Sequence, residues 1–222
     1  MNGYSLMPFN TSKNKPISRR ERELARHRQE MLEAAQAVFS EHGFEKARME
    51  DIAQRAEFAV GTLYRFFSSK DQLYLELLRD KADVMEVRIE EAINAGNTPL
   101  EKVRNIFFTR LDLFWDHKVF FRLLVQETEG SLHKPRLCSD ENLAARYHQF
   151  LEQLEAFFEA GIRESEFRDV PPHCLLTAFE GILRNYVAHL GYLDQDASRD
   201  PVEEQAMFQL FCEGARRVPE SD

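Results

Sequence analysis

The chain has 222 residues, of which 43% are hydrophobic and 30% are charged, and its formal net charge at pH 7 is −9. These values exclude a disordered or fibrous chain and are typical of one large globular domain or two small ones. No apolar run approaches the roughly eighteen residues that cross a membrane, and the polar N-terminus lacks the apolar segment of a secretory signal. We therefore expect a cytoplasmic protein.

The residue types favour helices. Glycine and proline are scarce, with nine and eight residues, whereas Glu, Leu, Ala, Arg, Gln and Phe are plentiful, and no stretch alternates between apolar and polar residues. The sequence predicts an all-α fold of about nine helices. The three cysteines, Cys138, Cys174 and Cys212, lie far apart, which favours reduced thiols over a disulfide framework or a zinc site. No metal or cofactor is expected.

Charge is distributed unevenly along the chain. Residues 1–70 contain twelve Lys and Arg against nine Asp and Glu, whereas the remaining residues contain 17 against 29. A polyanion is therefore attracted to the N-terminal part and repelled by the rest. The alternative is a basic tail that is only solvated.

The predicted elements begin with a flexible basic arm over residues 1–20. A long helix follows, with apolar residues at three- and four-residue steps, and Gly43 is placed to end it in a left-handed conformation. Two short helices are predicted over residues 49–56 and 60–67, with a tight turn between them.

Ser69 and Gln72 have the spacing of a capping box, in which the two residues satisfy each other's backbone N–H groups, at the start of a longer helix that ends near Gly96. Thr98 and Pro99 open the next helix. Further helices are predicted over residues 117–129, 139–164, 172–192 and 201–217.

Two short helices joined by a tight turn and braced by a longer one form a helix-turn-helix, expected here over residues 48–67. The second short helix of such a motif is narrow enough to enter the major groove of DNA. A small residue is required where the two helices cross, and Ala53 meets this requirement. Apolar residues must hold the pair together, as Ile52 and Leu63 can.

Residues 31–78 resemble the DNA-binding domain of the tetracycline-repressor (TetR) family. The matching motifs are FxxxG at residues 39–43, EDIAxxA at residues 50–56 and GTLYxxFxSKxxL at residues 61–73. The resemblance implies a DNA-binding domain over residues 21–85 and a helical effector-binding and dimerisation domain over residues 86–222. It also implies a homodimeric repressor that binds a palindromic operator and is released by a small molecule.

By this resemblance, Tyr64 and Lys70 fall on phosphate-contacting positions. Val60 is placed to touch a thymine methyl group, and Arg65 to reach either a guanine or a phosphate. The DNA-contacting candidates are Arg48, Val60, Thr62, Tyr64, Arg65 and Lys70.

Three residues depart from the family pattern. Glu57 stands where the turn usually has glycine, and a left-handed conformation there costs about 1 kcal/mol. Ala59 removes the usual capping serine before the second short helix, at a cost of about 0.5–2 kcal/mol. Arg48 stands at a helix start, where a cation opposes the helix dipole unless it faces a phosphate.

The last two long helices of the family pair into a four-helix bundle. The dimerisation candidates on these helices are Phe179, Leu183, Tyr186, Val187, Phe208 and Phe211, with packing inside the single chain as the alternative. The eighteen phenylalanines either fill the core or line a pocket for an apolar or aromatic ligand. The ligand-binding candidates are Phe107, Leu111, Trp115, Gln126, Tyr147 and Phe150.

Enzyme functions lack support in the sequence. It contains no glycine-rich phosphate loop, HExxH or GxSxG, and the seven histidines are dispersed. The alternative to a repressor is a helical adaptor or effector-binding protein whose DNA binding is weakened by Glu57 and Ala59. The expected partners are double-stranded DNA, a second copy of the chain and a small-molecule effector, and the sequence identifies neither operator nor ligand.

Overall fold

The computed structural model describes residues 18–121, 124, 140–193 and 198–216, and in these ranges the protein is all-α, as predicted. The described residues form no strand, and their only β-type pairing is an isolated bridge between Phe167 and Arg216. The helices are α1 (Arg19–Lys46), α2 (Met49–Arg55), α3 (Val60–Phe66), α4 (Lys70–Asn94), α5 (Pro99–Asp116), α7 (Glu141–Arg163), α8 (Pro172–Ala188) and α9 (Pro201–Ala215), with a π-helical turn at His189–Leu193.

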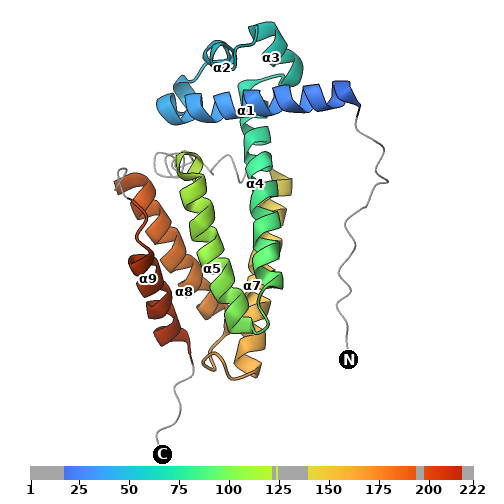
Figure 1. The fold of residues 1–222 in the computed structure, drawn as a ribbon. Helices are drawn as coiled ribbons and strands as arrows, with labels where there is room; N and C mark the ends of the chain where they lie inside the picture. Colours follow the sequence, from blue (N-terminus) through green and yellow to red (C-terminus); the bar gives the residue numbers. More distant parts are fainter. Residues whose placement is uncertain (1–17, 122–123, 125–139, 194–197, 217–222) are drawn as a thin grey trace, which may run out of the picture.

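The helices form a head and a body. The head, α1 to α3, lies across one end of an elongated body made of α5, α7, α8 and α9, and α4 runs from one to the other (Figure 1). Each part has its own apolar cluster. The head core contains Met31, Phe39, Ile52, Leu63, Phe67 and Tyr74, together with Phe120 and Leu143 from the body. The body core contains Ile106, Phe107, Leu154, Phe158, Phe179 and Phe211.

No linker separates the head from the body at residue 85. The helix α4 is continuous through this position, and Met85 packs against both apolar clusters. The head core also takes up Phe120 and Leu143, which lie far along the chain. The head and the body are therefore packed against each other along α4.

The start of the first helix differs from the prediction. Arg19 and Arg20 are helical and do not belong to a flexible arm, because Ser18 caps α1. Its hydroxyl accepts a hydrogen bond from the Glu21 N–H at 3.2 Å, and its own N–H donates to Glu21 Oε2 at 2.7 Å. Gly43 has the predicted positive φ, 74°, but the chain resumes one helical turn after it.

The capping box predicted at the start of α4 is only half formed. The Ser69 hydroxyl accepts a hydrogen bond from the Gln72 N–H at 3.1 Å. The Gln72 side chain accepts from the backbone N–H of Ser68, at 2.6 Å, and not from that of Ser69. The N-cap is therefore present, and the reciprocal bond is shifted by one residue.

The described helices of the body lie close to their predicted ranges. α7 begins two residues later than predicted because Asp140 caps it, and α8 ends at Ala188. Cys174 and Cys212 are free, while Cys138 and most of the predicted helix at 117–129 lie outside the described residues. None of the helices in the described ranges has the length and apolar character of a membrane span. No cluster of metal-binding side chains occurs in the same ranges.

Candidate nucleic-acid interface

The helix α3 is anchored by one side chain and leaves most of its surface uncovered. Of its seven residues only Leu63 is fully buried, in the head core with Ile52 and Ala53 of α2. Ala53 is small enough for the two helices to cross closely, and its carbonyl accepts a hydrogen bond from the Phe58 N–H at 2.9 Å. Because packing uses so little of α3, the helix is available to a partner.

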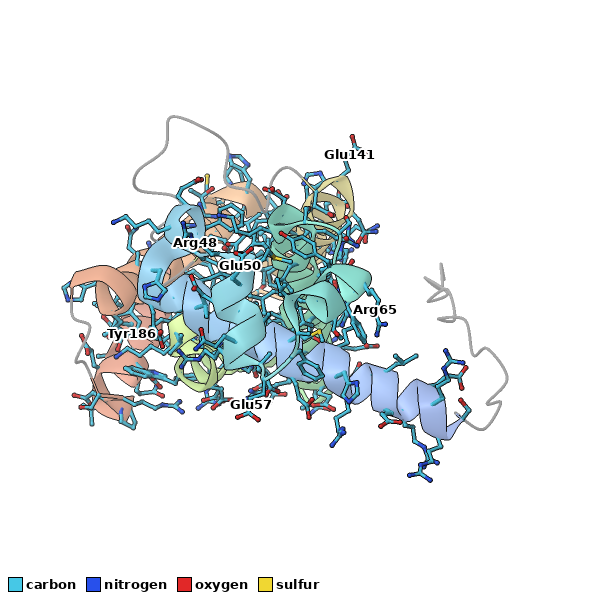
Figure 2. The ribbon with its side chains drawn as sticks, turned by 90° about the horizontal axis from the view of Figure 1, so that it is seen from above. Arg48, Glu50, Glu57, Arg65, Glu141 and Tyr186 are labelled. Atoms are coloured by element: carbon cyan, nitrogen blue, oxygen red, sulfur yellow. The ribbon has the colours of Figure 1, made fainter. Side chains whose placement is uncertain are left out.

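The uncovered face of α3 carries two large apolar side chains. Val60 is 39% exposed and Tyr64 is 47% exposed, and their spacing of four residues puts them on one face of the helix. Arg65 is exposed beside them, and Thr62 is half-buried (Figure 2). This group offers methyl contacts to bases, a hydroxyl to a phosphate, and a guanidinium to either.

The turn between α2 and α3 is held in a left-handed conformation by a residue other than glycine. Glu57 has a φ of 59°, which costs about 1 kcal/mol for a residue with a side chain. The backbone N–H of Glu57 donates to the Gln54 carbonyl at 3.1 Å, so the turn closes without glycine.

Two helix starts in the head have no side-chain cap, as the sequence led us to expect. At Ala59 the first turn of α3 is closed by the Thr62 N–H, which donates to the Ala59 carbonyl at 2.8 Å. At Arg48 the cation is exposed, and the acidic Glu50 and Asp51 in the first turn of α2 favour the helix dipole. Arg48 and Glu50 lie on the same outer side as α2 and α3 (Figure 2).

Lys70 has a different role from the one its motif position suggested. Its ammonium group donates to the carbonyls of Phe44, Glu45 and Ala47 at 2.7, 3.1 and 3.1 Å. It also lies 4.4 Å from the centroid of the Phe44 ring. An ammonium has three protons, and all three are used to tie the end of α1 to the start of α4. In this conformation no proton of Lys70 is free for a phosphate.

Three consecutive ion pairs connect the head to the body, and they were not predicted from the sequence. Glu76 of α4 accepts from Arg28 of α1 at 2.5 Å and from Arg79 at 2.9 Å. Arg79 in turn pairs with Asp140, the N-cap of α7, at 2.5 Å. Only the Arg79–Glu76 spacing is visible in the sequence, because the other partners come from separate helices.

The structure separates the predicted ligand-binding residues. Phe107 and Leu111 are fully buried in the body core. The indole N–H of Trp115 donates to Glu204 of α9 at 2.6 Å. Gln126 lies outside the described residues.

Tyr147 and Phe150 meet at a polar cluster between α5, α7 and α8. Their ring centroids lie 6.4 Å apart, and the guanidinium of Arg110 is 5.5 Å from the Phe150 ring. Arg110 pairs with Glu180, which also accepts the Tyr147 hydroxyl at 3.1 Å. Burial, followed by the negative charge of Glu180, raises the pKa of Tyr147. Arg184 donates to the Tyr147 hydroxyl at 3.2 Å, so two guanidinium groups converge here.

Five of the six predicted dimerisation residues are buried within the single chain. The five are Phe179, Leu183, Tyr186, Phe208 and Phe211, and the sixth, Val187, is half-buried. A side chain that the chain itself buries is not available to a partner, so these residues serve the body core. The alternative of packing inside the chain therefore accounts for them.

A different set of residues forms the outer face of α8 and α9. Val202 and Leu210 are 78% and 62% exposed. Ala206 is exposed midway between them, and Gly214 follows at the same four-residue spacing. A side chain at Gly181 or Gly214 would meet nothing within 4 Å. This stripe on α9 is apolar, and at Gly214 another helix could approach it closely.

Comparison with known proteins agrees with the geometry of the head. Residues 31–77 match the family model described as bacterial regulatory proteins, tetR family. The HTH-type transcriptional repressor KstR2 of Mycobacterium tuberculosis is 29% identical over 141 residues, which cover 64% of this chain and 69% of the relative. The uncharacterized HTH-type transcriptional regulator YhgD of Bacillus subtilis is 23% identical over 82% of this chain and 90% of its own length.

Solved structures extend the similarity of the fold to the body. The KstR2 structure from Mycobacterium tuberculosis has a TM-score of 0.70 at 23% identity and covers 86% of this chain and 95% of its own. The regulator FadR from Bacillus subtilis in complex with stearoyl-CoA has a TM-score of 0.68 at 21% identity and covers 84% and 98%. At these identities the likeness establishes the fold of the body.

Proposed function

Because the chain belongs to the TetR family of bacterial regulatory proteins, we propose that it is a homodimeric transcriptional repressor that binds a palindromic operator and is released by a small ligand. The proposal gives it no catalytic role and places it in the cytoplasm with the bacterial DNA. One observation carries it: the helix α3 keeps Val60, Tyr64 and Arg65 exposed on one end of the molecule, as a recognition helix must.

The second copy is proposed because one short helix makes too few contacts. Two heads that are separated by about 34 Å, or a multiple of it, read two half-sites of a palindrome. The exposed face of α9 formed by Val202, Ala206, Leu210 and Gly214 supports a four-helix bundle of α8 and α9 from two copies. An exposed apolar stripe of this kind suits an interface between identical helices.

For the ligand we favour a small molecule with an apolar part and an anionic group. Partly buried aromatic residues around the body core, including Phe150 and Phe157, offer apolar contact. Arg184 offers positive charge at the polar cluster beside Phe150, where the charge of Arg110 is balanced by Glu180. The solved FadR relative in complex with stearoyl-CoA supports this class, since that ligand joins a long apolar chain to an anionic carrier.

Selection of bound duplexes from a random pool tests the proposal. The account predicts enrichment of a two-fold symmetric sequence, whose affinity falls steeply with salt concentration. Release by stearoyl-CoA, with stearic acid and coenzyme A as separate controls, then tests the ligand class. Enrichment of no sequence would instead favour the alternative, an effector-binding or adaptor protein whose DNA binding is weakened at Glu57 and Ala59.

A further inference from the structure

The first two turns of α1 contribute no residue to either apolar cluster. Every residue from 18 to 26, here called the α1 extension, is exposed. The first residue of the helix that packs against another element is His27, whose ring lies 5.0 Å from that of Phe58. The extension therefore projects past α2 and α3, as Figure 2 shows from above.

The α1 extension is a defined helix although it is unsupported by packing. The capping box of Ser18 and Glu21 satisfies backbone N–H groups at its first turn. The hydrogen bond from the Ser18 backbone N–H to the Glu21 carboxylate, followed by the interaction of that carboxylate with the Ser18 side chain, lowers the pKa of Glu21. The cap orders the backbone of the first turn, so that the side chains project from a helix toward solvent.

The extension has a net positive charge, with four arginines against the two glutamates Glu21 and Glu23. Arg19, Arg20 and Arg22 form no ion pair with any described residue, and Arg26 lies 3.8 Å from Glu30. Cations in the first turns of a helix oppose its dipole. The arginines therefore destabilise the isolated helix, whereas their interaction with a bound polyanion would be favourable.

The direction of the extension selects the partner. It points away from α8 and α9, so a second copy docked on those helices does not cover it (Figure 1). Arg20 lies seven residues before His27, on the same helix face, and that face is turned toward the turn between α2 and α3. The extension thus continues the surface that carries α3.

We propose that the α1 extension binds the phosphate backbone of duplex DNA outside the half-site that α3 occupies. The inference rests on the proposed function and adds a sequence-independent contact to it. The eight helical residues of the extension span about 12 Å, which corresponds to roughly three to four base pairs along the duplex. The partner is double-stranded DNA because its charge complements the arginines and because the adjoining helix α3 is the DNA-binding element.

A salt titration with a 40-base-pair duplex of arbitrary sequence tests the inference. The double variant Arg19→Gln/Arg20→Gln removes two charges per protomer from exposed residues, and glutamine suits a helix, so that the fold is preserved. We expect about tenfold weaker binding and a slope of log affinity against log salt that is smaller in magnitude by about 1–2 for each protomer bound. The matched control Arg104→Gln/Arg163→Gln removes two charges from the body and leaves the slope unchanged.

The outcomes separate the inference from the proposed function. If the wild type binds and both double variants share its slope, the extension does not contact DNA and the inference is overturned alone. If the wild type binds no duplex, both the inference and the proposed function are overturned. A smaller slope in Arg19→Gln/Arg20→Gln only, with an unchanged circular dichroism spectrum, supports the contact.

Discussion

The guanidinium of Arg79, on α4, lies 2.5 Å from the carboxylate of Asp140, which caps α7. The other oxygen of the same carboxylate accepts the Leu143 N–H at 2.9 Å. One buried carboxylate therefore closes the first turn of a body helix and ties that helix to α4. Since α4 continues into the head, the ion pair between Arg79 and Asp140, here called the Arg79–Asp140 joint, connects the head to the body.

Asp140→Asn is expected to weaken this joint without removing the cap, since asparagine also caps helices. The pKa of Asp140 is lowered, first by the Leu143 N–H and also by Arg79. A carboxylate with a lowered folded pKa stabilises above its unfolded pKa and loses that contribution as the pH falls through the folded pKa. Urea unfolding at pH 7 should show a loss of about 1–2 kcal/mol in the variant, shrinking progressively below about pH 5.

Asp83→Asn is the matched control for that experiment. Asp83 pairs with Arg146 at 2.7 Å, but its side chain is 72% exposed. An exposed pair contributes little, and the free energy of unfolding should change by less than about 0.5 kcal/mol. An Asp140→Asn effect equal to the control effect, or independent of pH, would contradict the role assigned to the joint.

Lys70→Met should reduce stability more than it reduces DNA affinity. The variant leaves the carbonyls of Phe44, Glu45 and Ala47 without their shared donor, which should cost about 2 kcal/mol in the free energy of unfolding. Chemical denaturation measures this loss. The comparison variant Arg65→Met, on exposed α3, should leave stability within about 0.5 kcal/mol and weaken DNA binding. A Lys70→Met variant that kept its stability but lost DNA affinity would instead indicate that Lys70 contacts a phosphate.

Glu57→Gly should stabilise the head. Glycine removes the strain of a φ of 59°, which should raise the free energy of unfolding by about 1 kcal/mol. Part of this gain is offset because glycine has more conformational freedom in the unfolded chain. Glu57→Gln removes the same charge and keeps the side chain, so it should not share the gain. Thermal unfolding of both variants separates strain from charge, and equal shifts in Tm would show that charge is responsible.

Leu210→Arg should dissociate the proposed dimer. The leucine is 62% exposed on the outer face of α9, so the substitution leaves the body core intact but puts a charge into the helix pairing. Analytical ultracentrifugation should show a monomer with the wild-type circular dichroism spectrum. Val87→Arg, at a 56% exposed valine on α4, is the control and should remain dimeric. A monomeric wild type, or a dimeric Leu210→Arg, would exclude this interface.

Local patterns predicted the head well. The short helices at residues 49–55 and 60–66 and the left-handed turn at Glu57 follow from motif spacing and turn chemistry that act over a few residues. The start of α1 could also have been predicted, because Ser18 and Glu21 have the spacing of a capping box. The assignment of a flexible arm overlooked that pair.

Contacts between residues that are distant in the sequence could not be predicted from local sequence patterns. An apolar stripe on α8 predicts a buried face, but whether the chain or a partner buries it depends on how α5, α7 and α9 pack. For this reason Phe179 and Phe211 were assigned to the dimer although they fill the body core. Lys70 likewise matches the family motif in sequence. Its hydrogen bonds could not be predicted from that motif, because they depend on the path of the backbone from Phe44 to Ala47.

The central claim, that α3 is the recognition helix, is tested most directly by fluorescence anisotropy of Val60→Asp on duplex DNA. Val60 is 39% exposed at the first turn of α3, where aspartate favours the helix, so stability is preserved. The account predicts at least tenfold weaker binding for Val60→Asp and wild-type binding for the control Val87→Asp on α4. Equal affinity of the two variants and the wild type would contradict it.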